Sequence, residues 1–245
     1  MTSFSTHRTY SREEALHILD TVLLPKEEYG TRIGYGRDAQ GIGREAVGGD
    51  DPRLALTYGE FPTHSMDQLL DCALQHMSSQ TGRHNRISMI DLGSGCGRLV
   101  LYAALTRESW SVSGIEISDI LHNQAQEATN RGVQAGLFQT TPNRDAPFCQ
   151  LLLGPAEICQ DVLSAADIIF AYSTVWQTNG FSEELGAMIM DRSWSGLLAG
   201  SCRKGCVVVT TDRALDPREG WQLLDRMDVD NREVFGSTGF IQVLR

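Results

Sequence analysis

The sequence predicts an α/β fold with a mainly parallel, seven-stranded sheet and a helical extension at its N-terminal end. Three observations support this prediction. Short apolar runs alternate with amphipathic stretches along most of the chain, the pattern of repeated strand-helix units. The first complete unit contains a glycine-rich turn between its strand and its helix. The last two extended runs have only a short turn between them, which predicts a closing hairpin with an antiparallel last strand.

The N-terminal extension is expected to contain one helix and a glycine-rich segment. The helix spans 11–24, because a serine N-cap and acidic first-turn residues open it and Pro25 ends it. Residues 30–51 hold seven glycines and few large apolar side chains, which predicts a long loop or a segment that orders on binding. A linker and a mobile active-site lid are equally good interpretations. We therefore divide the chain into an extension at 1–61 and a main domain at 62–245.

The main domain is expected to open with a helix at 62–77, whose apolar residues share one face. Alternating strands and helices follow. The strands are expected at 87–92, 111–116, 148–153, 166–171 and 205–211. The helices are expected at 98–106, 118–131, 156–164, 182–194 and 217–226. Two last strands at 229–235 and 240–244 are separated by a turn at 236–239.

The composition limits the partners. The chain has 245 residues, of which 21 are basic and 31 acidic, for a net charge of −10. It contains no basic run, so direct nucleic-acid binding is not expected, whereas a basic protein tail would be attracted. No apolar stretch approaches the roughly 18 residues of a membrane span. The six cysteines are interpreted as reduced thiols of a cytoplasmic or nuclear protein, without a signal peptide. Cys202 and Cys206 have no second ligand pair nearby, so no zinc site is expected there.

The motif at Asp91-Leu92-Gly93-Ser94-Gly95-Cys96-Gly97 indicates the kind of ligand. Its alternate glycines allow a ligand to approach the backbone closely. The next strand ends at Glu116, about 20 residues later, where an acid can meet ribose hydroxyls. Dinucleotide sites use Gly-x-Gly-x-x-Gly around a pyrophosphate. An acid before the first glycine instead suits a ligand with an ammonium group and no phosphate, such as S-adenosylmethionine. The alternative is a glycine turn without a ligand.

These residues resemble motif I and its partner strand in the class I S-adenosylmethionine-dependent methyltransferases, which have a Rossmann-like sheet. Upstream, Thr57-Tyr58-Gly59-Glu60 leads into a helix. Together the two motifs are similar to the non-SET histone lysine methyltransferases, the disruptor-of-telomeric-silencing family, of which this chain would be a divergent member. The resemblance covers about residues 55 to 120, and the rest only in the order of its elements.

The resemblance and the motif together predict the cofactor site. In the family the Tyr-Gly-Glu loop folds over the cofactor, which implies that Tyr58 and Glu60 contact its methionine end. Glu157 stands near the position of an acid that reaches the adenine amine in the family, and it equally suits a first-turn acid beside a helix dipole. The expected cofactor-binding residues are Tyr58, Gly59, Glu60, Asp91, Gly93, Ser94, Gly95, Gly97, Glu116, Ile117 and Glu157. No metal is expected at this site.

The acceptor side departs from the family pattern. The family's Asn-Asn-Phe-aromatic segment, which forms the lysine channel, is replaced by Ala171-Tyr172-Ser173-Thr174-Val175-Trp176. Ser173 or Thr174 could supply a hydrogen bond, and Tyr172 and Trp176 could line a channel for an alkyl amine. Equally, the two aromatic side chains could simply pack at a strand end. The expected catalytic residues are Tyr58, Tyr172, Ser173, Thr174 and Trp176.

The resemblance implies N-methylation of a lysine in a protein substrate with a basic, histone-like tail. Methyl transfer needs donor and acceptor in line, and desolvation can deprotonate the amine without a dedicated base. The acidic charge and the altered acceptor segment keep a small-molecule methyltransferase open as an alternative. A catalytically silent protein that binds the cofactor and serves a partner is another. RNA methylation ranks third, because the Asn/Asp-Pro-Pro-Tyr/Phe motif is missing after the fourth strand.

Overall fold

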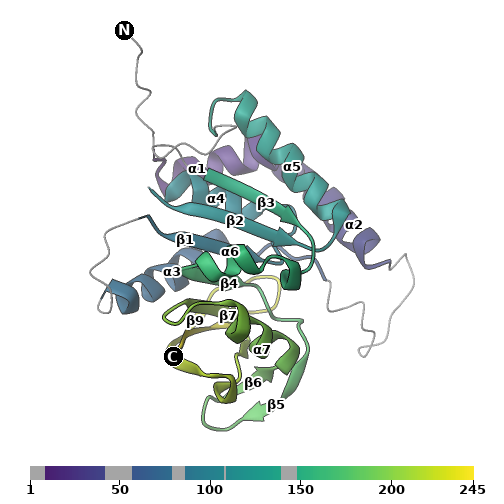
Figure 1. Ribbon diagram of the computed structural model, residues 1–245. Coiled ribbons are helices and arrows are strands. Elements are labelled where there is room, and N and C mark those ends of the chain that lie inside the picture. Colours follow the sequence, from purple (N-terminus) through teal and green to yellow (C-terminus); the bar gives the residue numbers. More distant parts are fainter. Residues whose placement is uncertain (1–8, 42–56, 79–85, 108, 139–147) are drawn as a thin grey trace.

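The computed structural model describes residues 9–41, 57–78, 86–107, 109–138 and 148–245, and its centre is a seven-stranded sheet. The strand order is β3-β2-β1-β4-β7-β10-β9 (Figure 1). The first five of these strands are parallel, and β10 runs antiparallel to both of its neighbours. The predicted α/β fold, with seven strands and an antiparallel last strand, is thereby confirmed.

The five parallel strands lie where the sequence predicts them, to within two residues. Their bounds are β1 Ser88–Leu92, β2 Ser111–Glu116, β3 Phe148–Leu153, β4 Ile168–Ala171 and β7 Val207–Thr211. The sheet ends with β10 Ser237–Leu244 and the edge strand β9 Trp221–Val229. The central strands β4 and β7 are buried along their whole length, as expected for parallel strands covered by helices on both faces.

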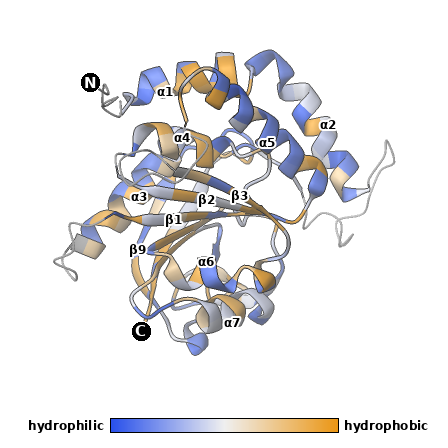
Figure 2. Ribbon diagram, turned by 45° about the horizontal axis from the view of Figure 1, so that its top comes forward, coloured by the Kyte–Doolittle hydropathy of each residue, from blue (hydrophilic) through white to orange (hydrophobic). Residues whose placement is uncertain are grey.

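Helices cover both faces of the sheet (Figures 1 and 2). One apolar cluster joins the sheet to the helices of its first face: α1 Arg12–Ile18, α2 Tyr29–Gln40, α3 Thr63–Ser78, α4 Arg98–Thr106 and α5 Asp119–Gln134. A second cluster joins the opposite face to α6 Gln160–Ala165 and α7 Arg192–Ser201. On α5, Leu121, Ala125 and Ala128 are buried on one side, and Figure 2 shows much of the rest of this helix as hydrophilic.

The N-terminal extension shares the core of the main domain. A capping box between Ser11 and Glu14 begins α1, as the sequence indicates, and a π-helix, η1 Leu19–Leu23, continues it. Ala15, Leu19 and Leu23 are fully buried in the first apolar cluster. The division at residue 61 therefore does not separate two cores among the described residues.

The expected loop at 30–51 is wrong for its first part. Residues 29–40 form α2, which ends at Gly41 in the left-handed conformation (φ 62°). Its glycines disfavour a helix, but tertiary packing overrides that preference. Gly36 lies directly against Tyr58, and the buried Arg32 pairs with Glu60. Residues 42–56, which include the rest of the expected loop, lie outside the described residues.

Four other expectations in the C-terminal half are wrong. Residues 182–194 are not one helix, because β5 Thr178–Ser182 and β6 Ala187–Met190 form a hairpin before α7. With β8 Arg213–Ala214 they make a separate three-stranded sheet.

The expected helix at 217–226 is only a short 3-10 turn, Pro217–Glu219, and β9 follows it. Gly220 (φ 94°) ends that turn, and the strand begins at the next residue. The last hairpin turns at 230–236, several residues earlier than the expected 236–239. The expected helix at 156–164 is split into a 3-10 turn, Ala156–Ile158, and α6.

Candidate cofactor and acceptor site

A cavity of about 380 Å³ opens where β1, β2, β3 and β4 end. Ligands of open α/β sheets bind at the carboxyl ends of the strands, and the volume falls within the range of small-molecule sites. Its wall comes from the Thr57–Phe61 segment, the turn after β1, the ends of β2 and β3, and the segment after β4. Ten of the eleven residues predicted to bind the cofactor lie on it, together with two further residues predicted to be catalytic: Tyr58, Gly59, Glu60, Asp91, Gly93, Ser94, Gly95, Glu116, Ile117, Glu157, Tyr172 and Trp176.

The glycine turn holds the ends of β1 and β2 together. The amides of Gly93 and Ser94 both donate to the carbonyl of Ile115, at 2.9 and 3.0 Å. Gly95 adopts a left-handed conformation (φ 55°), and a Cβ there would lie 2.6 Å from the Tyr58 ring. Gly97 has a different role from the one predicted. A Cβ on it would lie 3.1 Å from the Cβ of Ala125, so it allows α5 to pack closely and does not line the cavity.

Glu116 ends β2 with its carboxylate held by the backbone. One oxygen accepts from the Gly95 amide at 2.7 Å, and the other accepts from the Ser118 amide at 2.8 Å. Burial raises the pKa of this carboxyl group, although these amides oppose the shift by stabilising the charged form. A carboxylate can accept about four hydrogen bonds, so each oxygen keeps capacity for a ligand hydroxyl.

Asp91 and Ser94 supply polar atoms that a ligand could satisfy. Asp91 is 3% exposed at the end of β1, and burial, followed by the charge of Glu116, raises its pKa to about 7. The hydroxyl of Ser94 is buried and has no hydrogen-bond partner among the described residues. A buried carboxyl group that titrates near neutrality is ready to ionise when a cation binds beside it. This wall therefore fits a ligand that carries an ammonium group.

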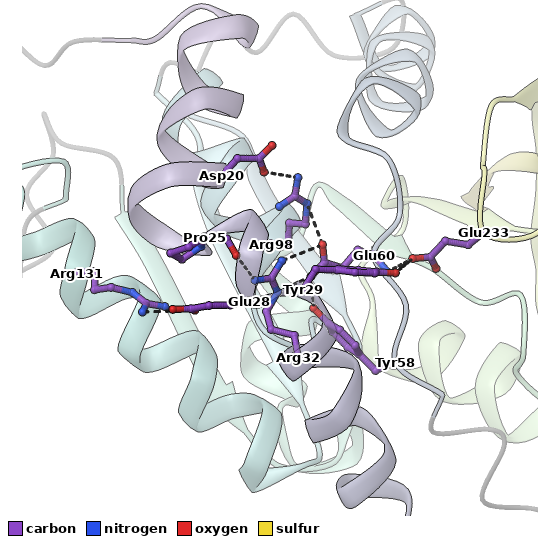
Figure 3. A network of polar contacts seen from close by, with 10 residues as sticks. All are labelled: Asp20, Pro25, Glu28, Tyr29, Arg32, Tyr58, Glu60, Arg98, Arg131 and Glu233. Carbon is purple, nitrogen blue, oxygen red and sulfur yellow. Dashed lines mark hydrogen bonds and ion pairs between the residues drawn. The ribbon is translucent and has the colours of Figure 1, made fainter. Parts of the chain in front are cut away.

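The loop at Thr57–Phe61 is fixed by an ion-pair network that the sequence did not reveal (Figure 3). Glu60 accepts from Arg32 Nε at 2.6 Å and from the Tyr58 hydroxyl at 2.9 Å. Its other carboxylate oxygen lies 3.5 Å from Arg98 Nε. Arg98 lines the cavity and is also paired with Asp20 at 2.8 Å. The network thus connects η1 and α2 of the extension to the wall of the cavity.

Tyr58 is enclosed by two glycines. A Cβ on Gly36 of α2 would lie 2.4 Å from Tyr58 Cβ, and Gly95 closes the other side of the ring. Burial, first of all, raises the pKa of the Tyr58 phenol well above its usual 10, so the hydroxyl remains a donor to Glu60. Both glycines are required because larger side chains would displace the ring.

An aromatic wall stands on the side of the segment after β4. Tyr172 packs on Phe61 with ring centroids 5.1 Å apart, and its hydroxyl accepts from Asn231 Nδ2 at 3.1 Å. Trp176 stacks on Trp194, with centroids 4.2 Å apart and planes at 25°. All of these rings line the cavity. Trp194 is not among the predicted site residues, because the sequence pattern places it at the end of a helix at 182–194, whereas the structure has β5, β6 and the start of α7 there.

Ser173 and Thr174, expected to shape the acceptor side, do not line this cavity. Ser173 is fully buried, and its hydroxyl donates to the Thr211 carbonyl at 2.8 Å. The Thr174 hydroxyl donates to the Asp212 carboxylate. Both side chains therefore connect the segment after β4 to the end of β7, and they position Tyr172 and Trp176 on either side of them.

Near the ends of β2 and β3, the cavity is lined by Ile117 and Glu157. Ile117 follows β2 and is 56% exposed, although it is apolar. Glu157 lies in the 3-10 turn after β3, beside the backbone of Gly154 and Pro155 on the same wall. An exposed apolar side chain next to an acid is suited to a flat ring that carries an amino group.

The seven-stranded sheet, with its antiparallel last strand and a cavity at its carboxyl edge, has the architecture expected of a class I methyltransferase. The sequence matches the family described as "Histone methylation protein DOT1" over residues 50–219. Because this match spans more than half of the chain, the chain belongs to that family. It is an S-adenosylmethionine-dependent methyltransferase, and S-adenosylmethionine is its cofactor.

Two solved structures are similar to this chain at low sequence identity. An RNA methyltransferase from Salinibacter ruber in complex with S-adenosyl-L-homocysteine is 19% identical, with a TM-score of 0.45 and coverage of 76% of this chain and 94% of that chain. An O-methyltransferase from Bacillus cereus, also in complex with S-adenosyl-L-homocysteine, is 13% identical, with a TM-score of 0.45 and coverage of 95% and 97%. No curated protein was found to match the chain. None of the helices in the described ranges is long and apolar enough to cross a membrane.

Proposed function

We propose that this enzyme methylates the side-chain amine of a lysine in a basic, histone-like protein segment. The observation that carries the proposal is the aromatic wall of Tyr172, Trp176 and Trp194 on one side of the cavity. Burial of an alkyl ammonium between aromatic rings removes its water, which lowers its pKa, and the amine that has released its proton to solvent has a lone pair that can attack the methyl group. The membership of a histone methylation family supports the same acceptor.

Asp91 and Arg98 suit the two charges of an amino-acid group. We propose that Asp91 binds the α-ammonium of the cofactor and that Arg98 binds its α-carboxylate, since both side chains line the cavity. Glu116 would accept from the ribose hydroxyls with its remaining lone pairs. Ile117 and Glu157 would contact the adenine ring and its amino group. When bound, S-adenosylmethionine supplies a methyl group on a positively charged sulfur.

Tyr58, Gly59 and Glu60 are proposed to hold the cofactor loop rather than to act in the chemistry. The Glu60 carboxylate is already engaged by Arg32, Arg98 and the Tyr58 hydroxyl. Its contribution is therefore to fix the loop and to orient the Arg98 guanidinium. Gly59 allows the loop to pass closely under Tyr172, because a Cβ there would lie 3.2 Å from Tyr172 Cε1.

The charge of the molecule supports a basic partner. With a net charge of −10, the chain attracts positively charged segments over several ångströms. Glu233 adds a carboxylate next to the aromatic wall, since its Oε2 would lie 2.5 Å from a Cβ on Gly59. A chromatin substrate would place the enzyme in the nucleus, one of the two compartments that the sequence predicts.

The test is methyl transfer from radiolabelled S-adenosylmethionine to a mixture of core histones and a small-molecule extract. We expect the label in the histone fraction, on lysine Nζ by mass spectrometry, and its loss with Trp194→Ala. The matched control, Gly34→Ala, has open space around its Cβ and should keep full activity. Label confined to the small-molecule fraction would replace the lysine proposal with a small-molecule methyltransferase. Tight S-adenosylhomocysteine binding without any transfer would indicate a cofactor-binding partner protein.

A further inference from the structure

A second group of chemically active side chains lies away from the cofactor cavity, between α3 and the edge strand β9. Cys72 and His76 stand four residues apart on α3, so both point from the same face of that helix. Asp225 of β9 meets them, and the potential ligand atoms of the three residues all lie within 4.8 Å of one another. None of the three lines the cofactor cavity.

The two distances from Asp225 in this cluster are close to those between neighbouring ligands of a tetrahedral metal centre. Asp225 Oδ2 lies 3.3 Å from Cys72 Sγ and 3.2 Å from His76 Nε2. Zinc bonds of about 2.0–2.3 Å at tetrahedral angles separate neighbouring ligand atoms by about 3.3–3.6 Å. A small outward movement of these side chains would therefore admit a metal ion.

We propose that Cys72, His76 and Asp225 form a zinc-binding site that joins α3 to β9. One sulfur, one nitrogen and one oxygen ligand suit Zn²⁺, which accepts all three and prefers four ligands in a tetrahedron. The side chains of His76 and Asp225 are 33% and 47% exposed. Water can therefore provide the fourth ligand.

The arrangement does not suit a nucleophilic cysteine. In a Cys-His-acid triad the histidine lies between the thiol and the carboxylate, so that it can take the thiol proton. Here the carboxylate lies between the other two groups. Burial, followed by the hydrogen bond to Asp225, raises the pKa of the Cys72 thiol to about 11. A protonated thiol is a poor nucleophile but can still become a metal ligand, because metal binding displaces its proton.

Metal binding has a simple balance of charge and protons. Zn²⁺ binds the Cys72 thiolate, a neutral His76 and the Asp225 carboxylate, and the thiol releases one proton to the solvent. The resulting site is neutral. It would replace two hydrogen bonds by bonds to a shared ion, and so fasten the C-terminal half of α3 to the edge of the sheet.

The experiment uses the full chain, stripped of metal with a chelator and titrated first with Co²⁺ and then with Zn²⁺. Co²⁺ reports on its own ligands, because a cysteine thiolate gives a charge-transfer absorption band. We expect one equivalent of Co²⁺ to produce this band and Zn²⁺ to abolish it. Cys72→Ser should remove the band, and His76→Gln and Asp225→Asn should each weaken Zn²⁺ binding by more than about tenfold.

Two control variants separate this site from incidental metal binding. His64→Gln changes a histidine of the same helix that has a carboxylate partner, Asp230 at 3.5 Å. Cys202→Ser changes a thiol elsewhere in the chain. Both should bind Zn²⁺ as the unchanged chain does. Binding of S-adenosylhomocysteine shows that each variant is folded and tests the other site separately. A chain without stoichiometric binding, or a cobalt band that survives Cys72→Ser, would overturn the proposal.

Discussion

Asp91 is the residue whose chemistry is most changed by the fold. Its pKa of about 7 means that the carboxyl group is partly protonated at neutral pH before a ligand arrives. A bound ammonium group needs the ionised form, so binding must release a proton whenever the pH lies below that pKa. We expect the affinity for S-adenosylhomocysteine to fall by up to about tenfold per pH unit below 7 and to level off above it.

Isothermal titration across this pH range, repeated in buffers of different ionisation enthalpy, measures both the affinity and the released proton. No histidine among the described residues lines the cavity. A change of affinity near pH 7 would therefore not come from a histidine in the cavity wall. An affinity that is flat from acidic to neutral pH would contradict the assignment of Asp91 to the ammonium group.

Asp91→Asn tests the same residue for stability as well as binding. The pKa of Asp91 is raised in the folded chain above its ordinary 3.8, so its protonation favours folding and this contribution is lost as the pH rises from about 4 to 7. At pH 8 the ionised, buried carboxylate opposes folding. We therefore expect the variant to bind S-adenosylhomocysteine more than about tenfold more weakly, without a lower melting temperature. A variant that melts much earlier would instead assign Asp91 a structural role.

At the scale of elements, α2 packs against Tyr58 and so supports the Thr57–Phe61 loop, which forms part of the cavity wall. Gly36→Ala would place a Cβ 2.4 Å from Tyr58 Cβ, so either α2 or the loop must move. We expect it to destabilise the fold by about 1–3 kcal/mol and to weaken cofactor binding by about tenfold. Thermal unfolding and calorimetric titration measure these two effects.

Gly34→Ala in the same helix is the matched control. Nothing lies within 4 Å of its Cβ position, and alanine favours a helix over glycine. We expect this variant to be more stable by about 0.5–1 kcal/mol and to bind the cofactor normally. Equal behaviour of the two variants would show that α2 does not support the loop.

Elements with local signals could be predicted from the sequence, whereas those fixed by distant contacts could not. The strand, the glycine turn and the second acid at Asp91–Glu116 are defined by neighbouring residues, and they form as expected. In contrast, α2 contains glycines that disfavour a helix, and Arg32 is held by an acid 28 residues away. The hairpin β5–β6 was mistaken for a helix, because short apolar segments fit both periodicities.

The same distinction applies to the site. Asp91 and Glu116 follow from a pattern in one stretch of sequence, and the structure brings them to the cavity wall. The positions of Trp194 and Glu233 depend on how the C-terminal half folds, so no local pattern identified them. Ser173 and Thr174 are neighbours of Tyr172 in the sequence, but the segment after β4 directs their hydroxyls to Thr211 and Asp212 at the end of β7.

At the scale of the whole molecule, the acidic charge should govern how a basic protein substrate is captured. With a net charge of −10, attraction acts mainly on the encounter and is screened by salt. We expect the KM for a histone substrate to rise several-fold between about 0.05 and 0.3 M salt, with a smaller change in kcat. Steady-state kinetics at several salt concentrations measure both constants.

The affinity for S-adenosylhomocysteine is the internal control, because the amino-acid group of that ligand carries no net charge and should respond little to salt. A KM for the histone substrate that does not change with salt would argue against capture of that substrate by the acidic charge. A parallel change in both measurements would point to an effect of salt on the fold itself.

One oxygen of Glu233 connects three distant parts of the chain. It accepts from the Tyr29 hydroxyl at 2.8 Å and from the Glu60 amide at 3.1 Å, so the β9–β10 turn holds both α2 and the cofactor loop (Figure 3). A cationic substrate that drew Glu233 toward itself would loosen both at once. Because both hydrogen bonds end on the same oxygen, α2 and the cofactor loop share one point of attachment to the β9–β10 turn.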